Sequence, residues 1–340
     1  MATKIKDVAR EAGVSIATVS LVFNRKPGVG RETRERVLRV ARDLDYRRAL
    51  PSGGDIPKGR TVRFLKISRH GHTVNRDHDS FIADYIAGLD QQARLSKWTV
   101  EVNMFANVRA EETVRFLSTV SADGAIVLGT ELSVDEVCAF GKAPIPVVIL
   151  DTYYGHLPLD LVDMSNEAAA FTAISHFVEH GHREIGFVKG DVEVANFRLR
   201  EQGFVDAMRH FGLKVNAESI LPVDTTFDGA YRDMAKYLAG GGKLPPALFI
   251  SNDIMAYGAM KAMKAAGIRV PDDVSVIGFD DLPQSARMDP PLTTISVSKR
   301  DMGRRAFDLL AARIAEGRDR PAEKVLIDGA LIVRDSVRAK

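Results

Sequence analysis

The chain has 340 residues, 45% of them hydrophobic, so it is long enough to bury the cores of two or three domains. Its single cysteine, Cys138, excludes an intramolecular disulfide and a cysteine-based metal cluster. No run approaches the ~18 apolar residues of a membrane span, and the N-terminus carries no apolar signal region. We therefore expect a cytoplasmic protein with no membrane partner.

The charges are distributed unevenly along the chain. Residues 1–60 contain 14 basic and 7 acidic side chains, a net of +7, whereas residues 61–340 contain 33 and 38, a net of −5. Such asymmetry is typical of a nucleic-acid-binding arm attached to an acidic body. A small basic helical bundle with a solvated charged face is the alternative.

Residues 1–48 are predicted to form an all-α head. Four apolar residues recur at the spacing of one helical face: Ile5, Val8, Ala9 and Ala12. Gly13 then breaks the helix, and Ser15 stands where the N-cap of a second helix belongs. A third helix is expected over residues 31–44. A helix, a tight turn and a second helix form a helix-turn-helix, whose second helix lies in the DNA major groove.

Residues 49–60 are rich in proline and glycine and indicate a linker. In residues 61–340, apolar runs alternate with helical patterns. Strands are predicted at 62–67, 100–105, 125–128, 147–150, 185–188, 247–250 and 274–277. Helices are predicted near 80–96, 110–120, 133–140, 166–180, 198–211, 228–239, 253–266 and 300–316. This alternation predicts an α/β body with parallel sheets covered by helices, and its length calls for two similar lobes.

The head sequence IKDVAREAGVSIATVSLVFN, residues 5–24, resembles the N-terminal head of the lac repressor (LacI/GalR) family. Body segments match the same family: HGHREIG at 180–186, FISNDIMAYGAM at 249–260, PDDVSVIGFDD at 271–281 and PPLTTI at 290–295. The resemblance implies a ligand-responsive transcriptional regulator, typically a repressor that binds a near-palindromic operator as a homodimer. It also implies a two-lobed body like that of periplasmic sugar-binding proteins, with the ligand between the lobes.

The same resemblance assigns the DNA contacts. Ile16, Ala17 and Leu21 fall on base-facing positions of the recognition helix. These side chains form no bidentate hydrogen bonds to bases and offer only apolar contacts, such as those to thymine methyls. The other expected contacts anchor the helix or meet the sugar-phosphate backbone: Ser15, Thr18, Ser20, Asn24, Lys4, Lys6, Arg34, Arg47 and Arg48.

The linker departs from the family pattern. Members usually carry a Pro-Asn-x-x-Ala-Arg-x-Leu stretch, which forms a hinge helix on DNA and inserts its leucine into the minor groove. Here Pro51, Gly53 and Gly54 disfavour a helix, and Asp55 stands in place of the leucine. We expect weak or absent kinking at the operator centre, with Arg47 and Arg48 supplying electrostatic contacts.

Polar residues at predicted strand ends are candidates for effector binding, because ligands of open α/β sheets bind beyond the carboxyl ends of strands. Asp151, Asn252 and Asp280 hold such positions, and Arg200 matches an arginine with which the family holds its ligand. Phe81 is a candidate for stacking on a sugar face, with a core role as the alternative. Asn252 is equally suited to capping the following helix. Such groups suit a sugar or a sugar acid.

The polar loop after the first body strand is expected to reach the mouth of the cleft, where Arg69 and His70 would touch the effector. Its histidines and aspartates also permit a transition-metal site, although neither a second histidine cluster nor a cysteine supports one. We expect no metal and no cofactor. No phosphate-binding loop, metal triad or nucleophile elbow points to an enzyme. The alternative function is a cytoplasmic small-molecule-binding protein without regulatory DNA binding.

Overall fold

The computed structural model describes residues 9–15, 18, 19, 22, 30, 33, 36, 37, 40, 60–71, 78–317 and 319–339. The chain divides into two compact units, Met1–Gly59 and Arg60–Lys340. Most of the linker and ten of the predicted DNA contacts lie outside the described residues: Lys4, Lys6, Ile16, Ala17, Ser20, Leu21, Asn24, Arg34, Arg47 and Arg48.

In the first unit, the described residues form a small helical core. Gly13 adopts a φ of +64° at the turn after the first helix, a conformation that glycine reaches without strain. The Ser15 hydroxyl oxygen accepts a hydrogen bond from the Thr18 backbone N–H at 3.0 Å, which confirms Ser15 as an N-cap. The buried core residues are Ala9, Ala12, Val19, Val22 and Val37.

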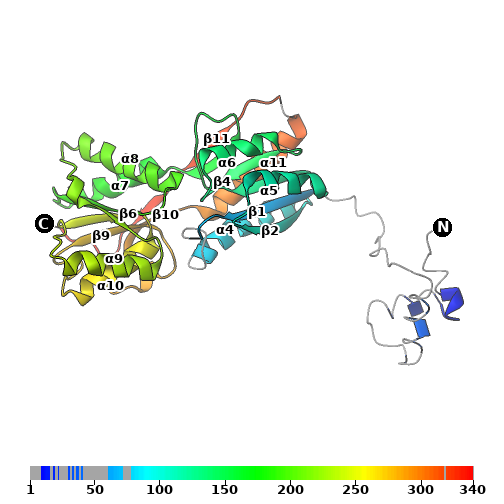
Figure 1. Ribbon diagram of the computed structural model, residues 1–340, viewed down its shortest axis with the longest axis horizontal. Helices are drawn as coiled ribbons and strands as arrows, with labels where there is room; N and C mark the ends of the chain where they lie inside the picture. The colour runs from blue at the N-terminus through cyan, green and yellow to red at the C-terminus, as the bar shows by residue number, and fades with distance from the viewer. Residues whose placement is uncertain are drawn as a thin grey trace. The chain divides into compact units, whose positions relative to one another are not determined.

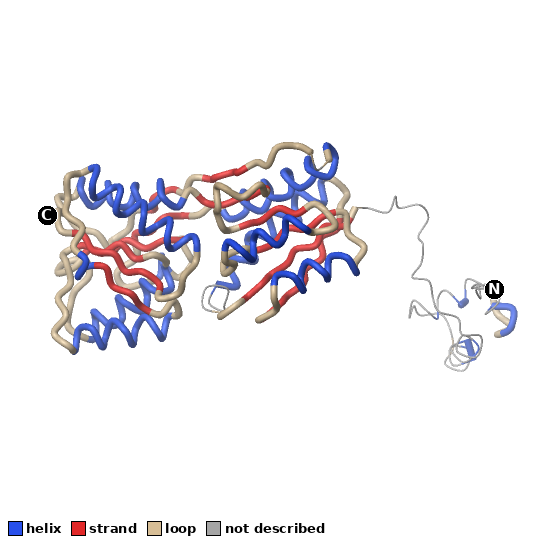
Figure 2. Tube along the Cα trace, turned by 45° about the horizontal axis from the view of Figure 1, so that its top comes forward, coloured by secondary structure: helices blue, strands red, loops and turns tan. Residues whose placement is uncertain are grey.

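The second unit contains two six-stranded sheets, each with helices on its faces (Figures 1 and 2). The sheet of lobe 1 has the order β11(Lys324–Ile327)-β5(Asp160–Met164)-β4(Val147–Leu150)-β3(Gly124–Leu128)-β1(Thr61–Ser68)-β2(Thr99–Ala106). The sheet of lobe 2 has the order β12(Ala330–Ile332)-β10(Thr293–Ser296)-β9(Ser275–Asp280)-β8(Ala247–Ile250)-β6(Ile185–Gly190)-β7(Ile220–Val223). Every pairing is parallel except that of β10 with β12. The prediction of two lobes with parallel sheets is confirmed.

Eight helices of the body were predicted within a few residues of their observed bounds. Those of lobe 1 are α4(Asp79–Leu95), α5(Ala110–Thr119), α6(Val134–Ala139) and α11(Lys299–Glu316). Those of lobe 2 are α7(Asn166–Glu179), α8(Ala195–His210), α9(Phe227–Ala239) and α10(Asp253–Ala265). Short 3₁₀ turns lie at η2(Phe140–Lys142), η3(Ala217–Ser219) and η4(Ser285–Arg287). Among the described residues, no helix is long and apolar enough to cross a membrane.

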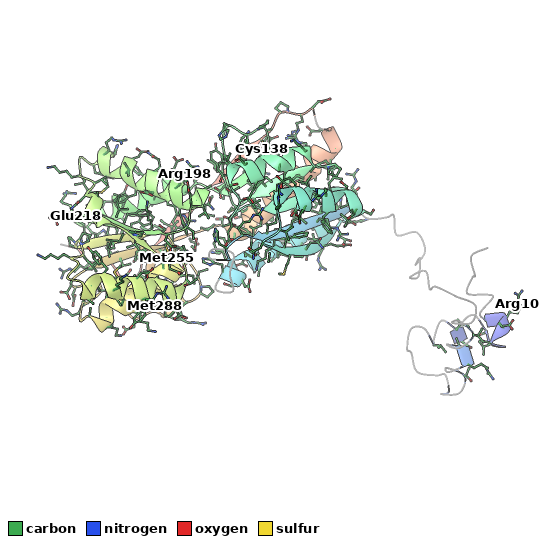
Figure 3. The ribbon with its side chains drawn as sticks, viewed as in Figure 1. Arg10, Cys138, Arg198, Glu218, Met255 and Met288 are labelled. Atoms are coloured by element: carbon green, nitrogen blue, oxygen red, sulfur yellow. The ribbon has the colours of Figure 1, made fainter. Side chains whose placement is uncertain are left out.

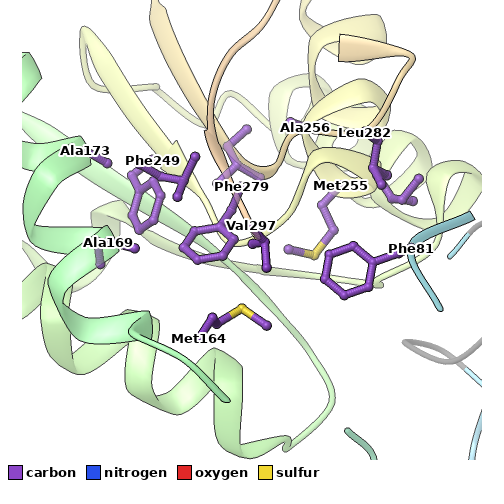
Figure 4. Packing of buried hydrophobic residues seen from close by; sticks show 14 of the residues in the cluster. Phe81, Met164, Ala169, Ala173, Phe249, Met255, Ala256, Phe279, Leu282 and Val297 are labelled. Atoms are coloured by element: carbon purple, nitrogen blue, oxygen red, sulfur yellow. The ribbon is translucent and has the colours of Figure 1, made fainter. Parts of the chain in front are cut away.

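The chain crosses between the lobes three times, from β5 to α7, from β10 to α11 and from β11 to β12. These connections place α11, which follows a strand of lobe 2, against α4 of lobe 1 (Figure 1). The two helices approach closely at glycines, because a Cβ on Gly88 would lie 2.0 Å from the Arg300 carbonyl oxygen. One apolar cluster spans both lobes and includes Phe81, Met164, Met255 and Phe279 (Figure 4).

Candidate functional site

A small cavity lies between the lobes, at the carboxyl ends of strands from both sheets. Its volume is about 40 Å³, far below the ~300–1,000 Å³ typical of small-molecule sites. The lobes must therefore move apart before a sugar can enter. The lining residues are His78, Phe81, Ile82, Thr130, Asp151, Met164, Val194, Asn196, Phe197, Arg200, Asn252 and Asp280.

Two buried carboxyl groups face the cavity, one from each lobe. Asp151 directly follows β4, and Asp280 is the last residue of β9. Their φ angles of 67° and 111° lie in the left-handed region, which non-glycine residues rarely occupy. Such strain is concentrated at functional sites, where the surrounding structure holds it in place. The backbone conformations of Asp151 and Asp280 therefore indicate a functional site at these strand ends.

Asp151 is held by three donors. It accepts hydrogen bonds from the Tyr85 hydroxyl at 3.1 Å, from the Asn196 amide at 3.0 Å and from the Thr130 hydroxyl. Tyr85 and Thr130 belong to lobe 1, whereas Asn196 lies on α8 of lobe 2. Asp151 is therefore a direct connection between the lobes.

Arg200 lies on α8, one helical turn after Asn196, and is 4% exposed. Its Nε donates to Asn166 Oδ1 at 2.8 Å, and its Nη1 donates to the Ser251 carbonyl oxygen at 2.5 Å. The guanidinium carbon lies 3.6 Å from the centroid of the Phe279 ring, and Nη2 lies 3.8 Å from Asp280 Oδ1. The guanidinium is thus fixed on two sides and faces Asp280 with one edge.

Asp163 interacts with the same groups from β5, just before the chain crosses to α7. Its Oδ2 accepts a hydrogen bond from the Asn166 amide at 3.1 Å, and the same amide lies 3.2 Å from Asn196 Oδ1. Sequence reasoning missed Asp163, because its strand was not predicted. It also missed Asn196, although the spacing of four residues to Arg200 places both on one helix face.

Burial raises the pKa of all three carboxyl groups. The pKa of Asp151 rises to about 6, although the hydrogen bonds from Thr130 and Tyr85 oppose the rise. That of Asp280 rises to about 7 against the attraction of Arg200, and that of Asp163 rises well above its usual range through burial and the nearby Asp151. Near neutral pH the three carboxyl groups therefore carry less negative charge than exposed ones would.

Asn252 and Phe81 line the cavity and also stabilise the fold. Asn252 caps α10 by accepting a hydrogen bond from the Met255 backbone N–H at 2.8 Å, and its amide nitrogen lies 3.5 Å from His78 Nε2. The alternative role of Asn252 as a helix cap is therefore confirmed. The Phe81 ring packs edge-on against Tyr85, with 5.1 Å between ring centroids, and belongs to the core.

Arg69 and His70 are not among the residues that line the cavity. The Arg69 guanidinium pairs with Glu136 and donates to the Val108 carbonyl oxygen. The backbone N–H groups of Arg69 and His70 donate to Glu131 at 2.7 and 3.1 Å. These contacts hold both residues against lobe 1. Among the described residues, no three histidine, cysteine, aspartate or glutamate side chains are grouped so that they could hold a metal ion.

Comparison with known proteins identifies the family. Residues 4–49 match "Bacterial regulatory proteins, lacI family", and residues 174–337 match "Periplasmic binding protein-like domain". The HTH-type transcriptional repressor CytR of Escherichia coli (strain K12) is 33% identical, with 99% of this chain and 97% of that protein covered. The repressor PurR of Photobacterium profundum is also 33% identical, over 99% of each. The chain belongs to the LacI family. It is a DNA-binding transcriptional repressor and not an enzyme.

Solved structures agree in fold with this LacI-family chain. A complex of the transcriptional regulator CelR with cellobiose is 25% identical, with a TM-score of 0.72 and coverage of 98% of this chain and 99% of that one. A lac repressor dimer bound to operator and the anti-inducer ONPF is 24% identical, with a TM-score of 0.74 and full coverage of both chains.

Two of the predicted DNA contacts of this LacI-family head, Ser15 and Thr18, lie among the described residues. Their hydroxyl oxygens are 2.9 Å apart, and the Ser15 oxygen also caps the helix. The capping bond fixes the start of the recognition helix, because it satisfies one of the backbone N–H groups that a helix leaves unpaired in its first turn.

Proposed function

We propose that this repressor binds a near-palindromic operator as a homodimer, and that a neutral sugar-type effector between the lobes controls its affinity for DNA. The observation that carries the proposal is the pair Asp151 and Asp280, buried on facing lobes in left-handed backbone beside Arg200. Hydroxyl groups of a sugar can donate to both carboxylates and accept from the guanidinium.

A neutral sugar is preferred to a sugar acid on two grounds. The cavity wall offers a ligand two carboxyl groups, those of Asp151 and Asp280, and one guanidinium, that of Arg200, so hydroxyl groups find more partners there than an acid group does. Arg69 and His70, which would have bound an acid group, contact Glu136 and Glu131 instead. The relative CelR, in complex with cellobiose, supports a carbohydrate.

Control of DNA binding follows from the contacts between the two lobes. Hydrogen bonds from Asn196 to Asp151 hold the lobes together around a cavity of about 40 Å³. A larger ligand that contacts both lobes stabilises a different spacing of the lobes from the one seen here. Differential affinity for two lobe arrangements is what allosteric control requires.

The homodimer is supported by apolar surface on both lobes. An open groove of about 530 Å³ on lobe 2 is lined in part by Phe227, Ile254, Tyr257 and Met288. On lobe 1, the edge strand β2 exposes Met104 at 71% and Val102 at 43%. The exposed apolar side chains of this edge strand are available for contact with a second copy of the chain. Sedimentation of the full chain is expected to give twice the mass of the monomer, and Met104→Lys is expected to lower the dimer affinity.

The head supplies the DNA affinity, and the repressor is expected to act in the cytoplasm, where operators are found. With +7 over residues 1–60, binding to a genomic operator fragment should weaken steeply with salt, since phosphate contacts release counterions. A gel shift that shows equal binding to random DNA would instead favour the small-molecule-binding alternative.

The decisive test combines both sites in one titration. Full-length Arg200→Ala should bind the operator as the wild type does and should lose its response to an effector found by a thermal-shift screen of sugars, sugar acids and nucleobases. Arg209→Ala is the matched control, because Arg209 lies on the same helix with its side chain 74% exposed. A normal effector response in Arg200→Ala would remove Arg200 from the site.

A further inference from the structure

A pocket of about 290 Å³ opens on lobe 1, at the opposite edge of the sheet from the cavity between the lobes. On β4, Val147 lines this pocket and Asp151, four residues later, lines the cavity. On β5, Asp160 and Met164 have the same relation. At about 3.3 Å per residue, the two spaces are about 13 Å apart. All lining residues belong to segments of lobe 1: Phe140, Gly141, Ala143, Ile145, Pro146, Val147, Pro158, Leu159, Asp160, Arg313, Arg320 and Ala322.

A buried ion pair forms the polar wall of this lobe 1 pocket. Arg313 Nε donates to Asp160 Oδ2 at 2.7 Å, and Arg313 Nη2 donates to Asp160 Oδ1 at 2.8 Å. The same Oδ1 accepts a hydrogen bond from the Glu323 backbone N–H, and Arg313 Nη2 also donates to the Pro321 carbonyl oxygen, both at 2.8 Å. These bonds hold the segment before β11 against α11, so the polar wall is in place before a ligand arrives.

Arg320 lines the pocket and has an unused donor. Its Nε pairs with Glu316 at 3.4 Å, and its Nη2 pairs with Glu323. Its Nη1 is buried and has no hydrogen-bond partner within the part of the chain that the structure describes. The Asp160 carboxylate already accepts three hydrogen bonds. The group that this end of the pocket requires is therefore an acceptor.

The remaining walls of the pocket are apolar. Phe140 is buried beneath it, and the half-buried side chains of Ile145 and Leu159 line it. Gly141 leaves space, because the nearest atom to a Cβ built there would be Leu159 Cδ2, at 3.7 Å. A ligand with an apolar body and one acceptor group matches a lining of this kind.

We propose that this pocket is a second ligand site, for a small carboxylic acid with an aromatic or branched aliphatic body. The carboxylate accepts from Arg320, and the body lies against Phe140, Ile145 and Leu159. A charged acceptor is preferred to a neutral one, because charge-assisted hydrogen bonds are about twice as strong and the lining contains two guanidinium groups and one carboxylate. The two glutamates that pair with Arg320 have side chains 60% and 43% exposed, so water screens their repulsion.

Three elements run from this pocket to the cavity between the lobes. They are β4, β5 and α11, and α11 packs against both strands (Figure 1). Arg313, near the end of α11, lines the pocket, whereas Lys299 at its start donates to the Asp280 carbonyl oxygen at 2.5 Å. A lobe movement that shifts these elements alters the pocket, so the acid binds two lobe arrangements with different affinities. Its binding therefore changes the affinity for operator DNA, a consequence that rests on the proposed control of DNA binding by the lobes.

Calorimetric titration of the full-length protein with three acids and their amides tests the site. The acids are benzoate, phenylacetate and isovalerate, and the amides are benzamide, phenylacetamide and isovaleramide. At least one acid should bind about tenfold or more tightly than its amide. Gly141→Leu fills the pocket and Arg320→Met removes the donor, and each should weaken the binding of that acid by at least about tenfold.

Two matched controls should bind the acid like the wild type. Gly240→Leu alters a glycine at the end of α9 on lobe 2, where a Cβ would lie 3.4 Å from the Lys236 carbonyl oxygen. Arg304→Met removes an arginine of α11 that pairs with the exposed Asp301. Thermal midpoints without ligand show which variants are folded, and Gly141→Leu and Arg320→Met test the pocket independently of each other.

Equal binding of acid and amide, no binding by any acid, or full affinity in both pocket variants would overturn the second site. Loss of binding in Arg200→Ala but not in Gly141→Leu would also overturn it, because the acid would then bind between the lobes.

A gel shift tests the effect of the acid on operator binding. A saturating concentration of the acid should change the operator affinity of the wild type by about fivefold or more and leave that of Gly141→Leu unchanged. Unchanged operator affinity in the wild type would overturn the coupling, whereas the sugar effector is tested separately by its own titration.

Discussion

Replacing Asp280 with asparagine removes a buried negative charge while preserving the shape of the side chain and a φ of 111°, since asparagine tolerates positive φ. Burial raises the pKa of Asp280 from 3.8 to about 7, and the attraction of Arg200 does not offset it. Between about pH 4 and pH 7 the native state therefore binds more protons than the unfolded chain, so this residue lowers the stability as pH rises through that window.

The magnitude follows from the same pKa difference. At 1.36 kcal/mol per pKa unit, the ionised Asp280 destabilises the native state by at most about 4 kcal/mol above pH 7 and by almost nothing near pH 4. Asp280→Asn should therefore be more stable than the wild type at pH 8, by about 2–4 kcal/mol, and its advantage should shrink toward pH 5.

Urea unfolding followed by far-UV circular dichroism at pH 5, 6, 7 and 8 measures this difference. Asp273→Asn is the control of opposite sign, because hydrogen bonds from Arg269 lower the pKa of the exposed Asp273 to about 2. That variant should be slightly less stable than the wild type, by the same amount at every one of these pH values. If Asp280→Asn is less stable than the wild type at pH 8, or differs from it equally at all four, the assignment of a desolvated carboxyl is wrong.

The same substitution should weaken effector binding, because an amide has one accepting oxygen where a carboxylate has two. A variant that gains stability and loses ligand affinity would show that Asp280 is retained for binding at a cost in stability. Calorimetric titration with the effector measures the loss.

Three further outcomes are expected. Gly88→Ala should lower the unfolding free energy by about 1–3 kcal/mol in chemical denaturation, since its Cβ would lie 2.0 Å from a backbone oxygen of α11. Arg313→Leu should destabilise by about 3–5 kcal/mol, because it leaves the buried Asp160 without its partner at 2.7 Å. Changes at the operator centre should weaken binding by less than the ~1–3 kcal/mol typical of a read position. A strong bend in a circular-permutation gel, lost in Leu50→Ala or Ile56→Ala, would contradict that last expectation.

Strands with continuous apolar runs were predictable from sequence, whereas strands interrupted by aspartate or proline were not. β3 has the sequence GAIVL and β4 has the sequence VVIL. Continuous apolar runs of this kind are typical of strands in a sheet that is covered on both faces. β5 reads DLVDM and β7 reads ILPV, so aspartates and a proline interrupt the pattern. Their residues are strands because the neighbouring strands supply hydrogen-bonding partners, which local sequence does not reveal.

The residues of the cleft also divide into those whose positions the sequence predicts and those whose positions it does not. The strand-end positions of Asp151, Asn252 and Asp280 follow from local pattern, because a polar residue after an apolar run stands at the edge of the sheet. The position of Arg69 outside the cavity wall does not follow from local sequence, because it depends on contacts with the distant residues Val108 and Glu136.

By itself, the sequence determined the helix-turn-helix head, the two-lobed α/β body and the family, because periodicity and long motifs are local properties of the chain. Tertiary structure alone decided which polar residues meet. It brought Tyr85, Asp163 and Asn196 to Asp151, from segments up to 66 residues away in sequence. It also closed the cavity to about 40 Å³ and raised the pKa of its carboxyl groups. Desolvation and contact between the lobes arise only when three chain crossings bring the carboxyl ends of strands from two sheets together, and no short stretch of sequence contains that arrangement.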